Sequence, residues 1–166
     1  MSNALAIAGV TAVIKDLLDS GMIDEAITDI LGAGVTVTSM APDTVSLDNN
    51  DSPQLNLFLH QVTPNVAWRN AALPSRDAGG NRVSNPPLAL DLHYLLTAYG
   101  RADLQAEVLL GYALQLLHET PVLPRDAIRR ALTPAVIDGA ILPTIYQSLR
   151  GADLAEQVEL LKVTPA

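Results

Sequence analysis

The chain contains no cysteine, few aromatic residues and few basic ones. The absence of cysteine excludes disulfide bonds, thiolate catalysis and cysteine-ligated metals. One tryptophan, one phenylalanine and four tyrosines among 166 residues leave little surface on which nucleic-acid bases could stack, and 10 Lys and Arg residues stand against 18 Asp and Glu residues. The composition therefore argues against a nucleic-acid-binding protein.

Long apolar runs and targeting signals are also missing. No apolar stretch approaches the roughly 18–20 uninterrupted residues of a membrane helix, and residues 1–4 lack the basic region and cleavage site of a secretory signal. We therefore expect no membrane insertion, and assembly in the cytoplasm. With 166 residues, 49% of them hydrophobic, the chain is long enough to bury a substantial core, and we expect a single domain over 1–166.

The net charge of −8 is concentrated in the first third of the chain. Through Asp51, one basic residue stands against eight acidic residues, whereas the remainder carries nine basic and ten acidic residues. Such asymmetry can steer a partner or orient subunits in an assembly, and it is also typical of a well-solvated face. Asp16 and Asp19 lie in this acidic third and are candidate interface residues.

Apolar spacing predicts two long helices and a short basic one. Apolar residues recur at three- and four-residue spacings from Asn3 to Ser20, and Gly21 is expected to end this helix in the left-handed conformation. The second long helix is expected over 103–119. Its predicted core face consists of Leu104, Val108, Leu109, Tyr112, Leu116 and Leu117. The short helix, over 125–131, carries a basic patch that is either a solvated face or a subunit salt bridge: Arg125, Arg129 and Arg130.

Alternating apolar residues predict strands at 35–40, 54–62, 88–99 and 158–163, with a further short strand at 65–70. Leu55, Leu57 and Leu59 share one side of the second strand. Polar residues on the opposite faces predict an antiparallel sheet with one packed and one wetter side; they are Asn56, His60, Asp91 and His93. The order of elements predicts an α+β fold, with a mainly antiparallel, few-stranded sheet packed by the N-terminal helix and the second long helix.

The longest connection is predicted between the strands at 54–62 and 88–99. Residues 74–87 contain two adjacent glycines and almost no hydrophobic residues, so we expect a long, mobile loop. Loops of this length within a compact domain usually serve a partner or are disordered. Arg76 and Arg82, with Arg69 just before the loop, make it locally basic within an acidic protein. These three arginines are further candidate interface residues.

Residues that could carry chemistry are sparse. No histidine shows a metal-ligand spacing, and the motifs of calcium loops, phosphate loops and nucleophile elbows are absent. If the strands pair, His60 and His93 can share a face with Asp91. They would form either a metal or proton-transfer cluster or, as is more common, hydrogen-bonded residues of a sheet. We expect no enzyme, with no catalytic residue, no metal site and no cofactor.

Several long stretches, in order, are similar to those of one protein family. They are residues 4–18 (ALAIAGVTAVIKDLL), 55–65 (LNLFLHQVTPN) followed by Trp68-Arg69-Asn70, 87–100 (PLALDLHYLLTAYG), and 107–123, which includes LHETPVL. Together they resemble the N-terminal domain of the cap, or tail-terminator, proteins of extracellular contractile injection systems. These systems are phage-tail-like particles of the Photorhabdus virulence cassette and antifeeding prophage type. The resemblance covers nearly the whole chain.

The resemblance implies a structural role and a fold like that of phage tail terminators. Such proteins assemble, typically as a hexameric ring, at the end of the particle distal to the baseplate, where they stop growth of the inner tube and anchor the last sheath layer. The implied partners are other copies of the chain and the tube and sheath proteins of a particle that is released or anchored. Family members generally continue past residues 162–165 into a Trp-containing helix and a further strand. This chain stops at Ala166, so a short form, a truncation and a separately coded half are open alternatives, and so is the completeness of its sheet.

A ring subunit needs apolar surface for its neighbours, a charge asymmetry that sets its orientation, and loops that adapt to a filament end. The aliphatic composition, the acidic first third and the basic loop supply all three. Two other interpretations stay open. One is a small adaptor or chaperone that binds one partner without forming rings, and the other is an enzyme that uses His60, Asp91 and His93.

Overall fold

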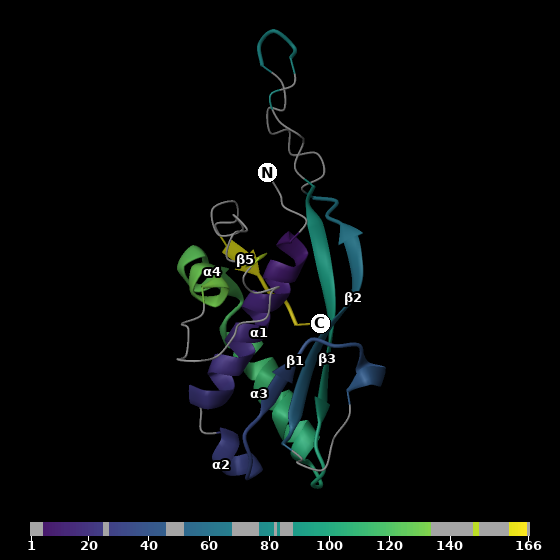
Figure 1. Ribbon diagram of the computed structural model, residues 1–166, viewed down its shortest axis with the longest axis vertical. Coiled ribbons are helices and arrows are strands. Elements are labelled where there is room, and N and C mark those ends of the chain that lie inside the picture. The colour runs from purple at the N-terminus through teal and green to yellow at the C-terminus, as the bar shows by residue number, and fades with distance from the viewer. Residues whose placement is uncertain are drawn as a thin grey trace.

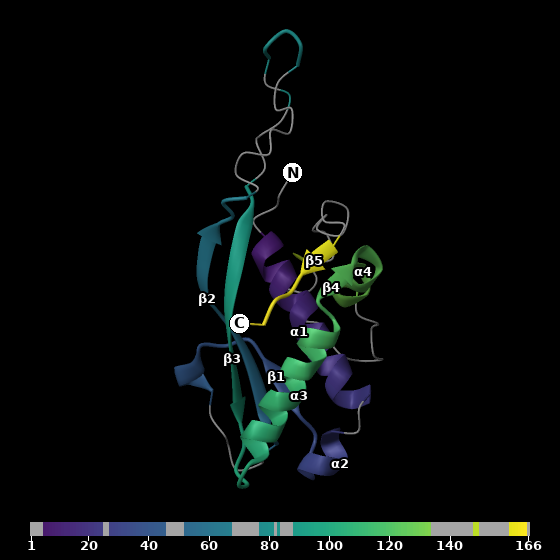
Figure 2. The same cartoon turned by 180° about the vertical axis from the view of Figure 1, so that it is seen from behind.

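The computed structural model describes residues 5–24, 27–45, 52–67, 77–81, 83, 88–133, 148–149 and 160–165. The helices and strands, in chain order, are α1 (Ala6–Asp24), α2 (Ile27–Leu31), β1 (Thr36–Thr38), the 3-10 turn η1 (Pro42–Thr44), β2 (Gln54–Pro64), β3 (Leu90–Tyr99), α3 (Gln105–Glu119), β4 (Val122–Pro124), α4 (Arg125–Leu132) and β5 (Leu160–Lys162). This confirms the predicted α+β class. α1 lies between the sheet of β1, β2 and β3 on one side and α4 with β4 and β5 on the other (Figures 1 and 2).

The main sheet is mixed, with the strand order β1-β2-β3. β1 is parallel to β2, whereas β2 pairs antiparallel with β3 along the whole length from Gln54↔Tyr99 to Pro64↔Leu90. A bulge between Leu59 and Gln61 leaves His60 as the extra residue of β2. The predicted C-terminal strand exists over Leu160–Lys162, but it pairs with β4 in a separate two-stranded sheet that the sequence analysis did not predict.

Two hydrophobic clusters share α1. The first lies between α1, α3 and the inner face of the sheet and contains the fully buried Leu18, Leu55 and Leu109. The second surrounds Ile128, between α1, α4 and β4, and takes Val13 from the other side of α1. Because both sides of α1 are covered, this helix is apolar over much of its circumference, as a buried helix must be.

The first helix does not end at Gly21 as predicted but continues to Asp24. Gly21 lies at the contact between α1 and α3. A Cβ atom at this position would overlap Leu116 Cδ2 of α3. The hydroxyl of Tyr112 on α3 also donates a hydrogen bond to the Gly21 carbonyl, at 3.2 Å. The glycine therefore permits close helix approach instead of terminating the helix.

The core face of α3 differs from the predicted one. Leu104 precedes the helix in the left-handed conformation (φ 62) and is 63% exposed, and Val108 is also exposed. The buried residues of α3 are Leu109, Ala113 and Leu117, which recur at four-residue spacing. Ala113 was not predicted on the core face, which was expected to consist of larger residues. Its small side chain lets α3 lie close to its neighbours.

Two predictions about the sheet are wrong, one about its polar side and one about a strand at 65–70. Asn56 is fully buried, because the segment that follows β1 crosses it. Its side chain accepts a hydrogen bond from the Met40 N–H at 2.9 Å and donates one to the Met40 carbonyl at 3.0 Å. Val66 and Ala67 form a turn instead of part of the predicted strand at 65–70, and residues 68–70 lie outside the described part of the chain.

Candidate functional site

A short row of polar side chains accompanies the pairing of β2 with β3. Asp91 and His93 alternate with the inward-facing residues of β3 and are exposed. His93 Nε2 lies 2.9 Å from Thr63 Oγ1, and Asn65 Nδ2 donates to Asp91 Oδ1 at 2.7 Å. The ring centroids of His60 and His93 are 6.4 Å apart, with the ring planes inclined by 58°. Strand pairing thus brings the two predicted histidines together.

The geometry of this row favours the structural interpretation over a catalytic or metal cluster. Within the part of the chain that the structure describes, no group of three or more His, Asp and Glu side chains is arranged to hold a metal ion. His93 and Asp91 each share a hydrogen bond with a side chain of the β2 end, so they serve to join the two strands.

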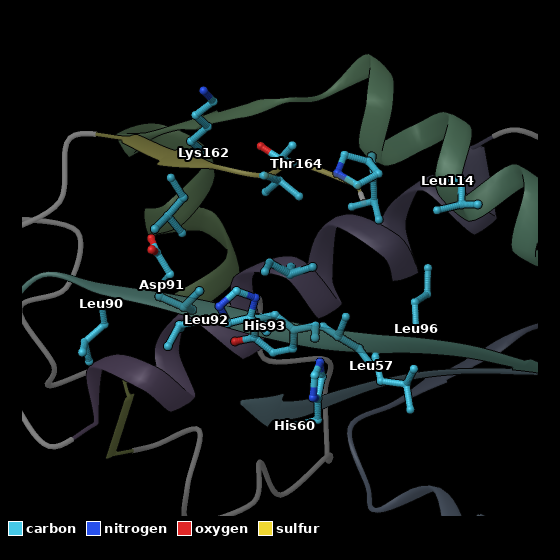
Figure 3. Close-up of a pocket in the computed structure, with 18 of the residues that line it drawn as sticks. Leu57, His60, Leu90, Asp91, Leu92, His93, Leu96, Leu114, Lys162 and Thr164 are labelled. Atoms are coloured by element: carbon cyan, nitrogen blue, oxygen red, sulfur yellow. The ribbon is translucent and has the colours of Figure 1, made fainter. Parts of the chain in front are cut away.

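A groove runs along the edge of β3, and sequence reasoning missed it; three residues of the polar row, His60, Asp91 and His93, belong to its lining. It has a volume of about 740 Å³ and is lined by residues 90–96 of β3 and by residues of β2, α1, α3 and the chain at 161–165 (Figure 3). Leu110, Leu114 and Leu117 of α3 line it at helical spacing. That spacing was visible in the sequence, but Leu110 and Leu114 fell outside the face assigned to the core.

Tyr94 lies in the lining of the groove and connects β3 to α1. Its hydroxyl is 2.8 Å from Thr11 Oγ1, which also donates to the Ile7 carbonyl at 3.1 Å. Burial raises the pKa of the Tyr94 phenol, although the hydrogen bond with Thr11 acts in the opposite direction. A neutral tyrosine held in this way fixes the position of β3 relative to α1.

Asp16, Asp19 and Arg130, three of the predicted interface residues, lie within electrostatic reach of one another where α1 packs against α4. Partial burial raises the pKa of Asp16, and the neighbouring charge of Asp19 raises it further. Arg130 of α4 and Lys15 act in the opposite direction. The acidic side of α1 is therefore partly neutralised by α4 within the same chain.

The other predicted interface arginines are distributed differently. Arg129 and Arg130 are exposed in the last turn of α4, where positive charge is favourable at the helix C-terminus. Arg125 is half-buried at the first position of this helix. Arg69, Arg76 and Arg82 lie outside the described residues, and none of these positions is tested as an interface.

Residues 77–81, at the centre of the predicted loop, form a turn organised by Asp77. Its Oδ1 accepts hydrogen bonds from the N–H groups of Gly79, at 2.9 Å, and Asn81, at 2.8 Å. These bonds, that of Asn81 first, lower the pKa of Asp77. Gly80 has φ +79, a conformation that favours glycine. In both views this turn lies beyond the ends of β2 and β3 and away from the helices (Figures 1 and 2).

Comparison with known proteins identifies the family. Over residues 9–166 the sequence matches the family described as the Pvc16 N-terminal domain. The chain belongs to this family. Pvc16 is Photorhabdus virulence cassette protein 16, a component of an injection system of the contractile type. The match includes every strand of the fold and the groove beside β3. No curated protein and no solved structure matches the chain.

Membership of the Pvc16 family gives the chain a structural place in a particle. It confirms the predicted type of assembly, whereas the match itself does not describe the position within the particle. None of the helices in the described ranges is both long and apolar enough to cross a membrane.

Proposed function

We propose that the chain is the cap, or terminator, subunit of a contractile injection particle. In this role it forms a homo-oligomeric ring, expected to be a hexamer, on the end of the inner tube distal to the baseplate. The ring ends tube growth and anchors the last layer of sheath. The observation that carries the proposal is the match to the Pvc16 family over residues 9–166, since it makes the chain a component of such a particle.

Exposed apolar side chains at one end of the molecule support an interface there. Ile23 of α1 and Ile30 of α2 are 76% and 72% exposed, and Leu104, just before α3, is exposed as well. These elements meet at the lower end of the molecule in Figure 1, where Gln105 Nε2 donates to the Leu31 carbonyl at 3.1 Å. Apolar residues gathered in this way are typical of a protein interface.

The two ends of the molecule differ in chemistry. The α2 end belongs to the acidic third of the sequence, whereas β2 ends and β3 begins at the opposite end of the molecule (Figure 1), and the sequence between these strands contains Arg69, Arg76 and Arg82. Contacts between unlike ends generate rings when the rotation closes. This polarity supports head-to-tail contact between copies, or contact of one end with tube and the other with sheath.

The decisive experiment compares particles assembled with and without this protein by negative-stain electron microscopy. We expect particles of uncontrolled length, or with unstable sheaths, in its absence, and normal particles when the gene is restored. Particles of normal length and normal sheath stability without the protein would refute the cap role.

Deletion of residues 74–86 tests the contribution of the basic loop. The β2–β3 pairing ends at Pro64↔Leu90, so residues 65–73 and 87–89 still connect the strands and the fold should be retained. We expect capping to be lost, as measured by particle length. A variant of full loop length in which Arg76 and Arg82, the two arginines that the deletion removes, are changed to Ala separates charge from length. Normal particle length in the deletion variant would contradict a role of the loop in capping.

A further inference from the structure

The most exposed large apolar side chains of the described residues occur in two groups. One group comes from α1, α2 and the residue before α3, which we call the α2 end. The other comes from the sequence between β2 and β3, which we call the β2–β3 end. Each of these side chains is 63% to 79% exposed; they are Ile23, Ile30 and Leu104 at the α2 end, and Val66, Val83 and Leu88 at the β2–β3 end. Exposed apolar groups of this kind are typical of interfaces.

The two ends are too far apart to cover each other within one chain. β2 and β3 pair over the distance between them, from Gln54↔Tyr99 near the α2 end to Pro64↔Leu90 at the β2–β3 end. Because β2 has 11 residues, this distance is about 35 Å. Figures 1 and 2 show α2 at one end of the molecule and residues 77–81 beyond the other. Each group therefore needs a partner outside the described part of its own chain.

The two ends also carry opposite charge. The α2 end has a net charge of −4 over residues 23–31 and 101–107. Its charged residues are Asp24, Glu25, Asp29, Arg101, Asp103 and Glu107. The β2–β3 end has a net charge of +1 over residues 65–91. Its charged residues are Arg69, Arg76, Asp77, Arg82 and Asp91. Unlike ends therefore attract each other, whereas contact between two α2 ends brings like charges together. Charge thus favours contact between unlike ends of two copies.

We infer that the α2 end of one copy contacts the β2–β3 end of the next copy. The inference rests on the ring proposed above, but not on the position of that ring in the particle. Because each copy uses a different surface toward each neighbour, a closed ring covers both apolar groups of every copy. Burial of these side chains contributes stability, and the unlike charges orient the copies. A different protein that covers one group leaves the other exposed, whereas a second copy is complementary to both.

The first test identifies the neighbour of the α2 end in assembled particles. A photo-crosslinking amino acid replaces Ile30 in the full-length chain. The control carries it in place of Val122, an exposed residue of β4 that belongs to neither end. We expect position 30 to give a product with the mass of two copies, in which mass spectrometry maps the crosslink to residues 65–89, and position 122 to give none. A crosslink from position 30 to another particle protein, to the α2 end of a second copy or within one chain would overturn the inference.

The second test reverses the charge at each end separately. Ile30→Arg adds positive charge to the α2 end, and Val66→Asp adds negative charge to the β2–β3 end. Because these positions are 72% and 79% exposed, both variants should fold, as circular dichroism and thermal unfolding establish. Val122→Arg and Val122→Asp are the matched controls.

We expect each end variant to enter purified particles at least about fivefold less than its control, as measured by quantitative mass spectrometry. Incorporation equal to that of the control in either variant would overturn the inference. Particle length is measured separately. Controlled length without the crosslink between ends refutes this contact and leaves the cap role, whereas the crosslink together with normal particles in the absence of the protein refutes the cap role alone.

Discussion

Asn56 offers a severe test of the structure, because a polar side chain with no exposed surface anchors the segment that follows β1. Its amide accepts hydrogen bonds from the Met40 N–H and from Thr38 Oγ1, and donates one to the Met40 carbonyl, all at 2.9 to 3.0 Å. Asn56→Ala removes all three bonds. Thr38→Val removes only one of them and serves as the control.

The expected loss follows from counting these bonds. A hydrogen bond contributes about 1 kcal/mol net, and a buried partner left unsatisfied costs more. Met40 is 51% exposed, so its backbone groups can regain water if the segment moves, and the loss should stay near the sum of the bonds. We expect Asn56→Ala to lower the free energy of unfolding by about 3 kcal/mol and Thr38→Val by about 1 kcal/mol.

Urea unfolding followed by circular dichroism measures both changes, since a domain of ordinary stability, about 5–15 kcal/mol, remains folded after such a loss. Asn56→Asp adds a pH test. An ionised carboxylate accepts from the Met40 N–H but cannot donate to its carbonyl, whereas the protonated acid can. Because burial favours the protonated form in the folded state, the variant should gain stability relative to the wild type as the pH falls. Losses in Asn56→Ala and Thr38→Val that agree within about 0.5 kcal/mol would refute the three-bond anchor.

Two further substitutions test helix contacts by the same unfolding measurement. Gly111→Ala should stabilise the protein by about 0.5–1 kcal/mol, because an added Cβ meets nothing within 4 Å. The free energy of unfolding of Gly21→Ala should lie about 1–3 kcal/mol below that of Gly111→Ala, because its Cβ overlaps Leu116. Equal stabilities of the two variants would refute the close approach of α1 and α3. Asp16→Asn should raise stability at pH 7 by no more than about 0.5 kcal/mol. Ionisation of Asp16 disfavours folding, because its pKa in the folded state lies above the ordinary value of 3.8. The stability gain of Asp16→Asn should therefore disappear as the pH falls through the folded pKa toward 3.8. A gain that persists below pH 3.8 would contradict this reasoning.

The α+β class and the antiparallel pairing of β2 with β3 could be predicted from the sequence, because each depends on local periodicity. Strict alternation in β2 and β3 identified both strands, and the buried Leu55 and Leu57 lie on the predicted side. The parallel pairing of β1 and the pairing of β4 with β5 involve three-residue strands, whose patterns are too short to distinguish from irregular chain. Such pairings are decided by tertiary packing.

The errors share a physical cause, which is contact between segments distant in sequence. A glycine at position 21 is typical of a helix end. Its actual role depends on α3, whose Tyr112 lies 91 residues later in the sequence and contacts Gly21. Asn56 alternates with leucines as a solvated residue does, but the segment carrying Met40 covers it. The groove beside β3 could not be predicted either, because its lining comes from five elements that are distant in sequence, namely α1, β2, β3, α3 and β5.

The hydrophobic content of the chain, 49%, first indicated apolar surface shared between subunits. Packing narrows that inference, since much of the aliphatic excess is used within the subunit, where α1 is buried by one cluster on each side. Apolar surface that the described residues leave accessible includes the groove beside β3, the α2 end with Ile23 and Ile30, and Val66 and Leu88 next to the ends of β2 and β3. Assembly contacts driven by apolar burial should therefore involve these places first. The exposed charges of α4 are not needed to explain assembly contacts. Arg129 and Arg130 already have a role within the subunit, because positive charge stabilises the last turn of this helix.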